Sequence, residues 1–208
     1  LVRSKLMKRG GVGYVQPGPD TFPQVDEVNK LIEACGALPT ITWLDGTSEG
    51  EQAAEELFGL MIEKGAVALN IVPDRNWNIA DPDVKAVKLR NLYDVVDLAQ
   101  RLDLPLNIGT EMNAYGKPYI DDFDAPELTP IREPFMDGAY FVYGHTLLQR
   151  ASALGYQSAW AAAHFPTRRE RNVFYTKVGR ALAPGSITLE ALSALGEAPE
   201  PQEIMGAS

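Results

Sequence analysis

The chain has 208 residues, of which 45% are hydrophobic, 9% aromatic and 23% charged, a globular composition that argues against collagen, coiled coil and a wholly disordered chain. The 19 basic and 28 acidic residues give a formal net charge of −9, which argues against general binding to nucleic acid or anionic membranes. No apolar run reaches the ~18 residues of a membrane span, and the single cysteine cannot form an internal disulfide, so we expect a soluble, cytoplasmic protein.

Short apolar runs alternate with helical patterns along the first two-thirds of the chain, which predicts parallel β/α units. Apolar β-rich runs predict strands at residues 13–16, 38–44, 66–72, 104–110 and 139–143. Side chains that can cap a helix predict helix starts at Thr21, Ser48, Asp81 and Thr167.

The sequence predicts that the chain is organised in three parts. Residues 1–145 are expected to form a β/α barrel-like portion that includes a long polar loop at 111–134, residues 146–196 a helical extension, and residues 197–208 a disordered tail. A complete β/α barrel has eight strands and ~250 residues. We therefore expect an α/β fold that is the C-terminal portion of a distorted TIM-like barrel, completed by preceding sequence or by a second chain.

Polar side chains follow the third predicted strand, at the end where parallel α/β proteins hold their functional residues. Asp74 could ligate a cation or act as a general base, Arg75 could hold an anionic group, and Trp77 could wall a pocket. A structural alternative stays open, because such a loop can also use its Asp and Asn side chains to satisfy turn backbone and its Trp to pack on the next helix.

Two further strand ends carry candidate residues. Glu111 follows the fourth predicted strand and is expected to be a ligand or acid–base group, with a structural salt bridge as the alternative. Asn113 stands two residues later, on the same side if the strand continues. His145 follows the fifth predicted strand, so we expect it to meet the other strand ends in space.

Two stretches resemble the second half of the polymerase-and-histidinol-phosphatase (PHP) family: the helix-to-strand step at residues 28–39 and the Gly-Thr-Glu-Met-Asn run at 109–113. This resemblance implies a distorted β/α barrel that holds two or three divalent metals for phosphoester hydrolysis. The chain departs from the family at its motifs. Thr42 and Trp43 stand where the family has His-Pro, and Glu111 and Asn113 stand where it has Asp and His.

The first functional hypothesis is a metal-dependent hydrolase of the PHP or amidohydrolase kind, acting on a small, anionic substrate. A bound Zn²⁺, Mn²⁺ or Mg²⁺ would lower the pKa of a water molecule. The predicted metal ligands are Asp45, Asp74, Glu111 and His145. Three of these, Asp74, Glu111 and His145, are also the predicted catalytic groups. The predicted substrate-binding residues are Trp43, Arg75, Asn76, Trp77, Asn113 and Lys117.

The alternative hypothesis is a non-catalytic domain that binds a sugar or a small acid on the same scaffold. In this case aromatic rings would stack on the ligand, and acidic and amide groups would bind its hydroxyls. The rings are those of Trp43, Trp77 and Tyr115, and the polar groups are those of Asp45, Asn76 and Asn78. A third hypothesis is a structural half-barrel that serves only assembly.

Overall fold

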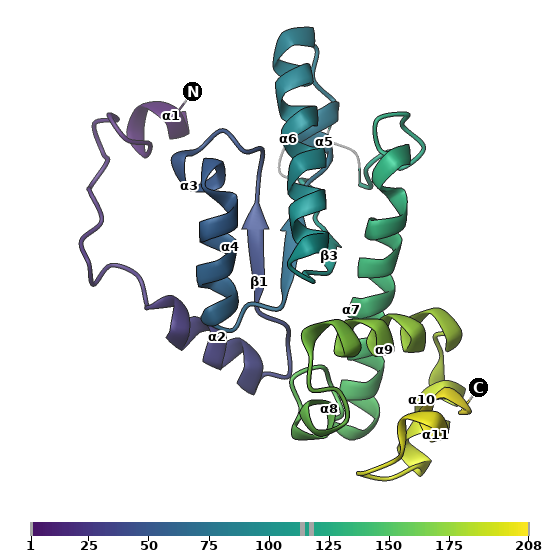
Figure 1. The fold of residues 1–208 in the computed structure, drawn as a ribbon. Helices are drawn as coiled ribbons and strands as arrows, with labels where there is room; N and C mark the ends of the chain where they lie inside the picture. The colour runs from purple at the N-terminus through teal and green to yellow at the C-terminus, as the bar shows by residue number, and fades with distance from the viewer. Residues whose placement is uncertain (1, 113–114, 117–118, 208) are drawn as a thin grey trace.

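The computed structural model describes residues 2–112, 115–116 and 119–207, which form a mixed α/β fold. Its sheet is open and parallel, with the strand order β1-β2-β3 (Figure 1). The strands are β1 (Thr40–Trp43), β2 (Ala68–Ile71) and β3 (Leu106–Ile108). Ile41, Leu69 and Leu106 lie in register across the sheet. The structure thus confirms parallel β/α units, and in the described residues it shows three strands in an open sheet and no barrel.

Helices precede the sheet, connect its strands and follow it. Before the sheet lie α1 (Val2–Leu6) and α2 (Val25–Ala34). The connections contain α3 (Glu49–Gln52), α4 (Ala54–Glu63), α5 (Asp74–Trp77) and α6 (Pro82–Arg101). After the sheet come the 3-10 turn η1 (Thr129–Ile131), α7 (Arg132–Ser152), α8 (Ala159–His164), α9 (Arg168–Ala181), α10 (Ser186–Ala194) and α11 (Pro201–Met205). No helix in the described part of the chain is long and apolar enough to cross a membrane.

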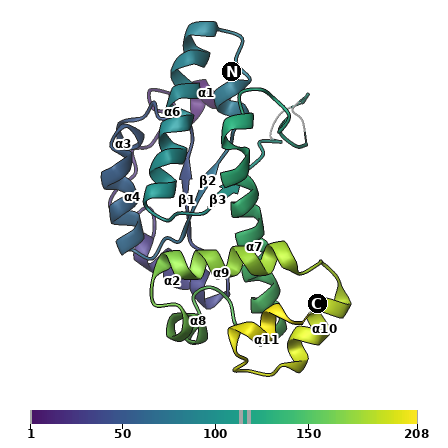
Figure 2. The same cartoon turned by 45° about the vertical axis from the view of Figure 1, so that its right-hand side comes forward.

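The two faces of the sheet differ in polarity because strand side chains alternate between faces. One face is apolar and packs against α4 and α6, which lie on the same side of the sheet in both views (Figures 1 and 2). Its buried side chains are Ile41, Trp43, Leu69, Ile71 and Leu106. The opposite face carries a row of polar side chains at one register position: Thr42, Asn70 and Asn107. Thr42 is exposed, and the two asparagines are half-buried.

Helix α7 lies along the free edge of β3 and continues into a second core. A Cβ atom at Gly138 would overlap the carbonyl oxygen of Leu106, so the helix and strand backbones touch there. Farther along α7, Phe141 and Leu148 pack with Tyr175 of α9. Figure 2 shows α9 crossing α7. The sheet and the C-terminal helices are therefore joined through one long helix, which spans the predicted boundary at residue 145.

Three local expectations fail. Residues 13–16 join no sheet, and Val15 is 83% exposed. Residues 139–143 belong to α7, because Phe141, His145 and Leu148 recur at helical spacing and are all buried. Thr21 caps no helix, since α2 begins after Gln24.

The tail differs from its expected disorder, because it contains α11. Ile204 of this helix is 1% exposed, and the Trp160 indole Nε1–H donates to the Pro199 carbonyl at 2.9 Å. The tail is therefore fixed to the second core by one buried apolar side chain and one buried hydrogen bond.

Candidate functional site

The carboxyl ends of the strands meet at one edge of the sheet, where α5 follows β2 after two residues. Asp74, the first residue of α5, is 7% exposed, and its Oδ1 accepts a hydrogen bond from Asn78 Nδ2 at 2.8 Å. Its backbone N–H donates to Oδ2 of the buried Asp121 at 3.0 Å. Asp121 stands 47 residues later in the sequence, so the long loop after β3 folds back onto α5.

Asn76 connects two strand ends. Its Nδ2 donates to the Leu44 carbonyl at 3.0 Å, just beyond β1, and to the Val72 carbonyl at 3.2 Å, just beyond β2. The residue is fully buried, and its Oδ1 has no hydrogen-bond partner among the described residues. Asn76 therefore braces the strand ends, and an unmatched acceptor of this kind is rare in a folded protein.

Arg75 and Glu111 form an ion pair in which Nη1 lies 2.8 Å from Oε1, with both side chains about one-third exposed. This ion pair is the salt bridge stated above as the structural alternative for Glu111, and its role as a ligand or acid–base group stays a prediction. The Nε atom of Arg75 is buried without a partner among the described residues. The guanidinium therefore retains a donor that Glu111 does not use.

Asp45, two residues beyond β1, is also engaged. Lys88 Nζ lies 2.8 Å from its Oδ2, while the Thr47 backbone and hydroxyl donate to its Oδ1 at 3.2 and 2.5 Å. Burial by itself raises the pKa of Asp45, but the hydrogen bonds from Lys88 and Thr47 and the charge of Lys88 outweigh it and hold the pKa below its usual value. Asp45 is therefore an ionised carboxylate, and the ammonium group of Lys88 lies beside it.

A pair of amides occupies the polar face next to these groups. Asn107 Nδ2 donates to Asn70 Oδ1 at 2.6 Å. A Cβ atom at residue 109 would lie 3.0 Å from Asn70 Nδ2, so Gly109 leaves room for that amide. The sequence prediction did not include Asn107 or Asn70 among the site residues. The sequence signal for them is a polar residue between two apolar residues of a strand, which places the polar side chain on the opposite face of the sheet.

The structure separates His145 from the other three predicted metal ligands. His145 lies in α7, where its Nε2 is 3.1 Å from the carbonyl oxygen of Gly36, before β1 begins, whereas Asp45 follows the end of β1. These two residues thus lie at opposite ends of the same strand, because residues 139–143 are helical and carry His145 away from the expected edge. The described residues contain no group of three or more His, Cys, Asp or Glu side chains that could hold a metal ion. The predicted set therefore does not fit one metal site.

The remaining predicted residues are placed as follows. Trp43 is 1% exposed and packs in the apolar core of the sheet. Trp77 is half-buried against the sheet core, and Lys85 Nζ lies 6.0 Å from its ring centroid. Asn113 and Lys117 lie outside the described residues. Tyr115 is fully exposed.

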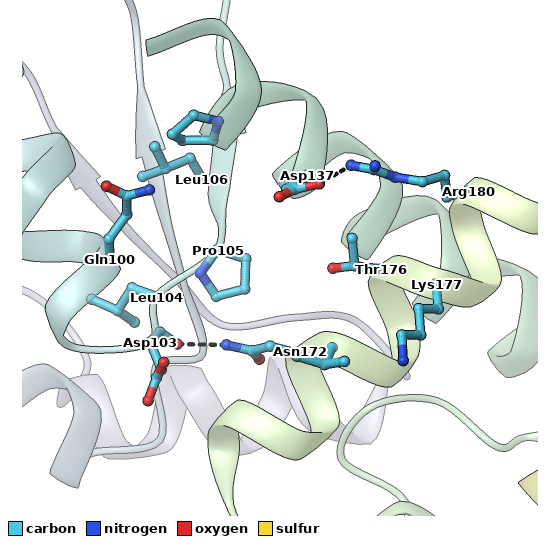
Figure 3. A pocket seen from close by; sticks show the side chains of 13 residues that line it. Gln100, Asp103, Leu104, Pro105, Leu106, Asp137, Asn172, Thr176, Lys177 and Arg180 are labelled. Carbon is cyan, nitrogen blue, oxygen red and sulfur yellow. Dashed lines mark hydrogen bonds and ion pairs between the residues drawn. The ribbon is translucent and has the colours of Figure 1, made fainter. Parts of the chain in front are cut away.

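A cavity of about 650 Å³ lies away from the carboxyl edge of the sheet, at the entry to β3 and between that strand, α7 and α9. Figure 3 shows Leu104 and Pro105 on the strand side and Thr176 on the α9 side. Arg180 is paired there with Asp137 and with Glu133, and Asn172 Nδ2 donates to the Asp103 carbonyl at 2.7 Å. Most polar groups of this cavity thus serve the packing of α9, and no sequence motif pointed to it.

No protein-family model, curated protein or solved structure matches the chain. Its function must therefore be inferred from its own residues.

Proposed function

We propose that the carboxyl edge of the sheet binds a small polar organic molecule, a sugar or a small carboxylic acid. The observation that carries this proposal is the Asn70–Asn107 pair, which lies on the polar face of the sheet beside Gly109. A purely structural sheet face would bury apolar side chains at these register positions, as the opposite face does.

The chemistry of the amide pair supports this class of ligand. Since Asn107 Nδ2 donates to Asn70 Oδ1, the Asn70 NH₂ group remains a donor and the Asn107 carbonyl remains an acceptor. A hydroxyl group or a protonated carboxyl group can pair with both at once. Both side chains are half-buried, so a bound ligand would exchange solvent for matched hydrogen bonds.

The charged groups at the rim set the expected selectivity. Asp45 is paired with Lys88, and Arg75 with Glu111, so these two pairs add no net charge to the edge. A ligand with several hydroxyls is favoured over one with several charges, because a highly charged ligand would have to break these pairs.

Thermal unfolding in the presence of sugars and small carboxylic acids tests the proposal. A ligand present at 100 times its Kd stabilises the folded state by about 2.7 kcal/mol, and each kcal/mol raises the Tm of a chain of this size by about 2–4 °C. We expect Asn107→Asp to abolish that rise. The substitution replaces the amide group that donates to Asn70 Oδ1 with a carboxylate, which cannot donate. Asn172→Asp is the matched control: it also removes one amide-to-carbonyl hydrogen bond, but on α9, and it should leave the ligand-induced rise intact.

Metal-dependent hydrolysis remains a prediction, and the same measurement tests it. A Tm rise with Mn²⁺, Zn²⁺ or Mg²⁺ that EDTA reverses, together with turnover of a phosphoester, would favour the hydrolase over the binding domain. A rise with sugars or acids that is indifferent to EDTA would favour the binding domain.

We also propose that the sheet is a portion of a larger β/α barrel. In a barrel the helices cover the outer face of the sheet, and the inner face looks toward the strands that close it. The helix-covered apolar face and the exposed Thr42 on the opposite face agree with this arrangement. Small-angle scattering on a chain that includes further sequence, or on an assembly of two copies, would test whether the sheet closes.

A further inference from the structure

A smaller cavity, of about 280 Å³, lies at the amino edge of the sheet, away from the proposed ligand site. Its walls come from the end of α2, the turn between α4 and β2, the segment before α8, and the first turn of α9. Two guanidinium groups line it, those of Arg168 and Arg171. Glu33 lines it as well, so the formal charge of the lining is +1 in a chain whose net charge is −9.

Neither arginine has an acidic partner within 4.0 Å among the described residues. Among the described residues, the Nη atoms of Arg168 make long hydrogen bonds, all 3.4 Å, to the carbonyl oxygens of Ala66 and Val67. Arg171 lies over the Tyr156 ring, with its Cζ 5.4 Å from the ring centroid, and its buried Nε has no hydrogen-bond partner in the part of the chain that the structure describes. Arg75, the third half-buried arginine, is paired with Glu111. Since guanidinium is always charged, the two arginines leave positive charge and donors unmatched.

Two contacts order the side chains around this cavity. The aromatic face of Tyr156, itself 2% exposed, supports the Arg171 guanidinium. Gln157 Nε2 donates to Glu33 Oε1 at 2.8 Å. One oxygen of the Glu33 carboxylate is therefore already hydrogen-bonded to an amide. The cavity is thus framed by fixed side chains, and its volume suits a ligand of a few heavy atoms.

We propose that Arg168 and Arg171 form a binding site for a small oxyanion, either a phosphate or a carboxylate. Two oxygen atoms of such an anion match the planar fork of a guanidinium, so two arginines can bind three or four oxygens together. Glu33 at the rim repels negative charge, which disfavours highly charged anions. This site shares no residue with the carboxyl-edge site, so either proposal can fail without the other.

Isothermal titration with sodium phosphate, sodium acetate and sodium chloride at constant ionic strength tests the proposal and separates the two anion classes. We expect saturable binding of phosphate or of acetate and none of chloride. Arg168→Gln/Arg171→Gln should weaken binding at least tenfold. Arg169→Gln is the matched control. Arg169 stands between Arg168 and Arg171 in the sequence, but its side chain is exposed and pairs with Asp103 outside the cavity. The anion affinity of this variant should stay within twofold of wild type.

Glu33→Gln supplies a test that does not depend on how well the double variant folds. Removing that negative charge should tighten anion binding severalfold. The proposal is overturned if phosphate and acetate behave as chloride does, if Arg169→Gln loses as much affinity as the double variant, or if Glu33→Gln leaves the affinity unchanged.

Discussion

His145 shows how one side chain can join segments that are far apart in the sequence. Its Nδ1 accepts a hydrogen bond from the Tyr156 backbone N–H at 3.0 Å, so in the neutral ring Nε2 carries the proton and donates to the Gly36 carbonyl at 3.1 Å. The residue is 6% exposed. Burial lowers its pKa, and the bond to Gly36 opposes this effect without cancelling it.

This lowered pKa predicts a loss of stability in acid. Above about pH 6.5, the usual pKa of histidine, the ring is neutral in both states and its contribution to folding is complete. As the pH falls below that value, the unfolded chain takes up a proton before the folded chain does, so the free energy of unfolding decreases by up to about 1.4 kcal/mol per pH unit. The decrease levels off below the folded-state pKa. Urea unfolding at a series of pH values from 7.5 to 5 measures it.

The variant His145→Gln should flatten this pH dependence while lowering stability at pH 7.5, because glutamine does not titrate. His164→Gln is the control, since it removes the other histidine and leaves His145 in place, so the pH dependence should persist. A wild-type slope unchanged by His145→Gln would show that another group is responsible. The sequence could not predict this role, because the partners of His145 are backbone groups 109 and 11 residues away along the chain.

At the scale of elements, α7 determines how the sheet joins the C-terminal helices. Gly138 permits the helix to touch the β3 backbone at Leu106. We expect Gly138→Ala to destabilise the protein by about 3 kcal/mol, since the atom that blocks the new methyl group is a backbone oxygen and cannot move alone. Thermal or urea unfolding checks this value.

The control is Gly59→Ala, which makes the same substitution inside α4 where the new methyl group meets nothing within 4 Å. It should stabilise the protein by up to about 1 kcal/mol, because alanine is the better helix former. Equal effects of the two substitutions would mean that α7 does not rest on β3 as described.

Local signals predicted some elements well. Ser48, Asp81 and Thr167 cap α3, α6 and α9 through the expected hydrogen bonds, because a cap depends only on residues within one helical turn. The run at 139–143 misled the prediction. Its aromatic and β-branched residues favour a strand in isolation, but packing against β3 and α9 decides its conformation, and local sequence does not contain that information.

At the scale of the whole molecule, the sequence predicted which side chains gather where the strands end but not how they pair. Asp45, Asp74, Arg75, Asn76 and Glu111 do lie where the strands end, because parallel strands bring their carboxyl ends together. Their roles depend on distant partners: Lys88 is 43 residues from Asp45, and Glu111 is 36 residues from Arg75. No local pattern identifies such pairs.

The central claim is that the polar face at the carboxyl edge binds a small polar molecule, and side-chain amide signals test it most directly. In ¹⁵N–¹H spectra recorded during titration with sugars and small carboxylic acids, the NH₂ signals of Asn70 and Asn107 and the backbone signal of Gly109 should shift together and saturate, while the NH₂ signal of Asn172 stays fixed. If every compound leaves the Asn70 and Asn107 signals unmoved, or shifts them only together with signals throughout the protein, the claim is contradicted.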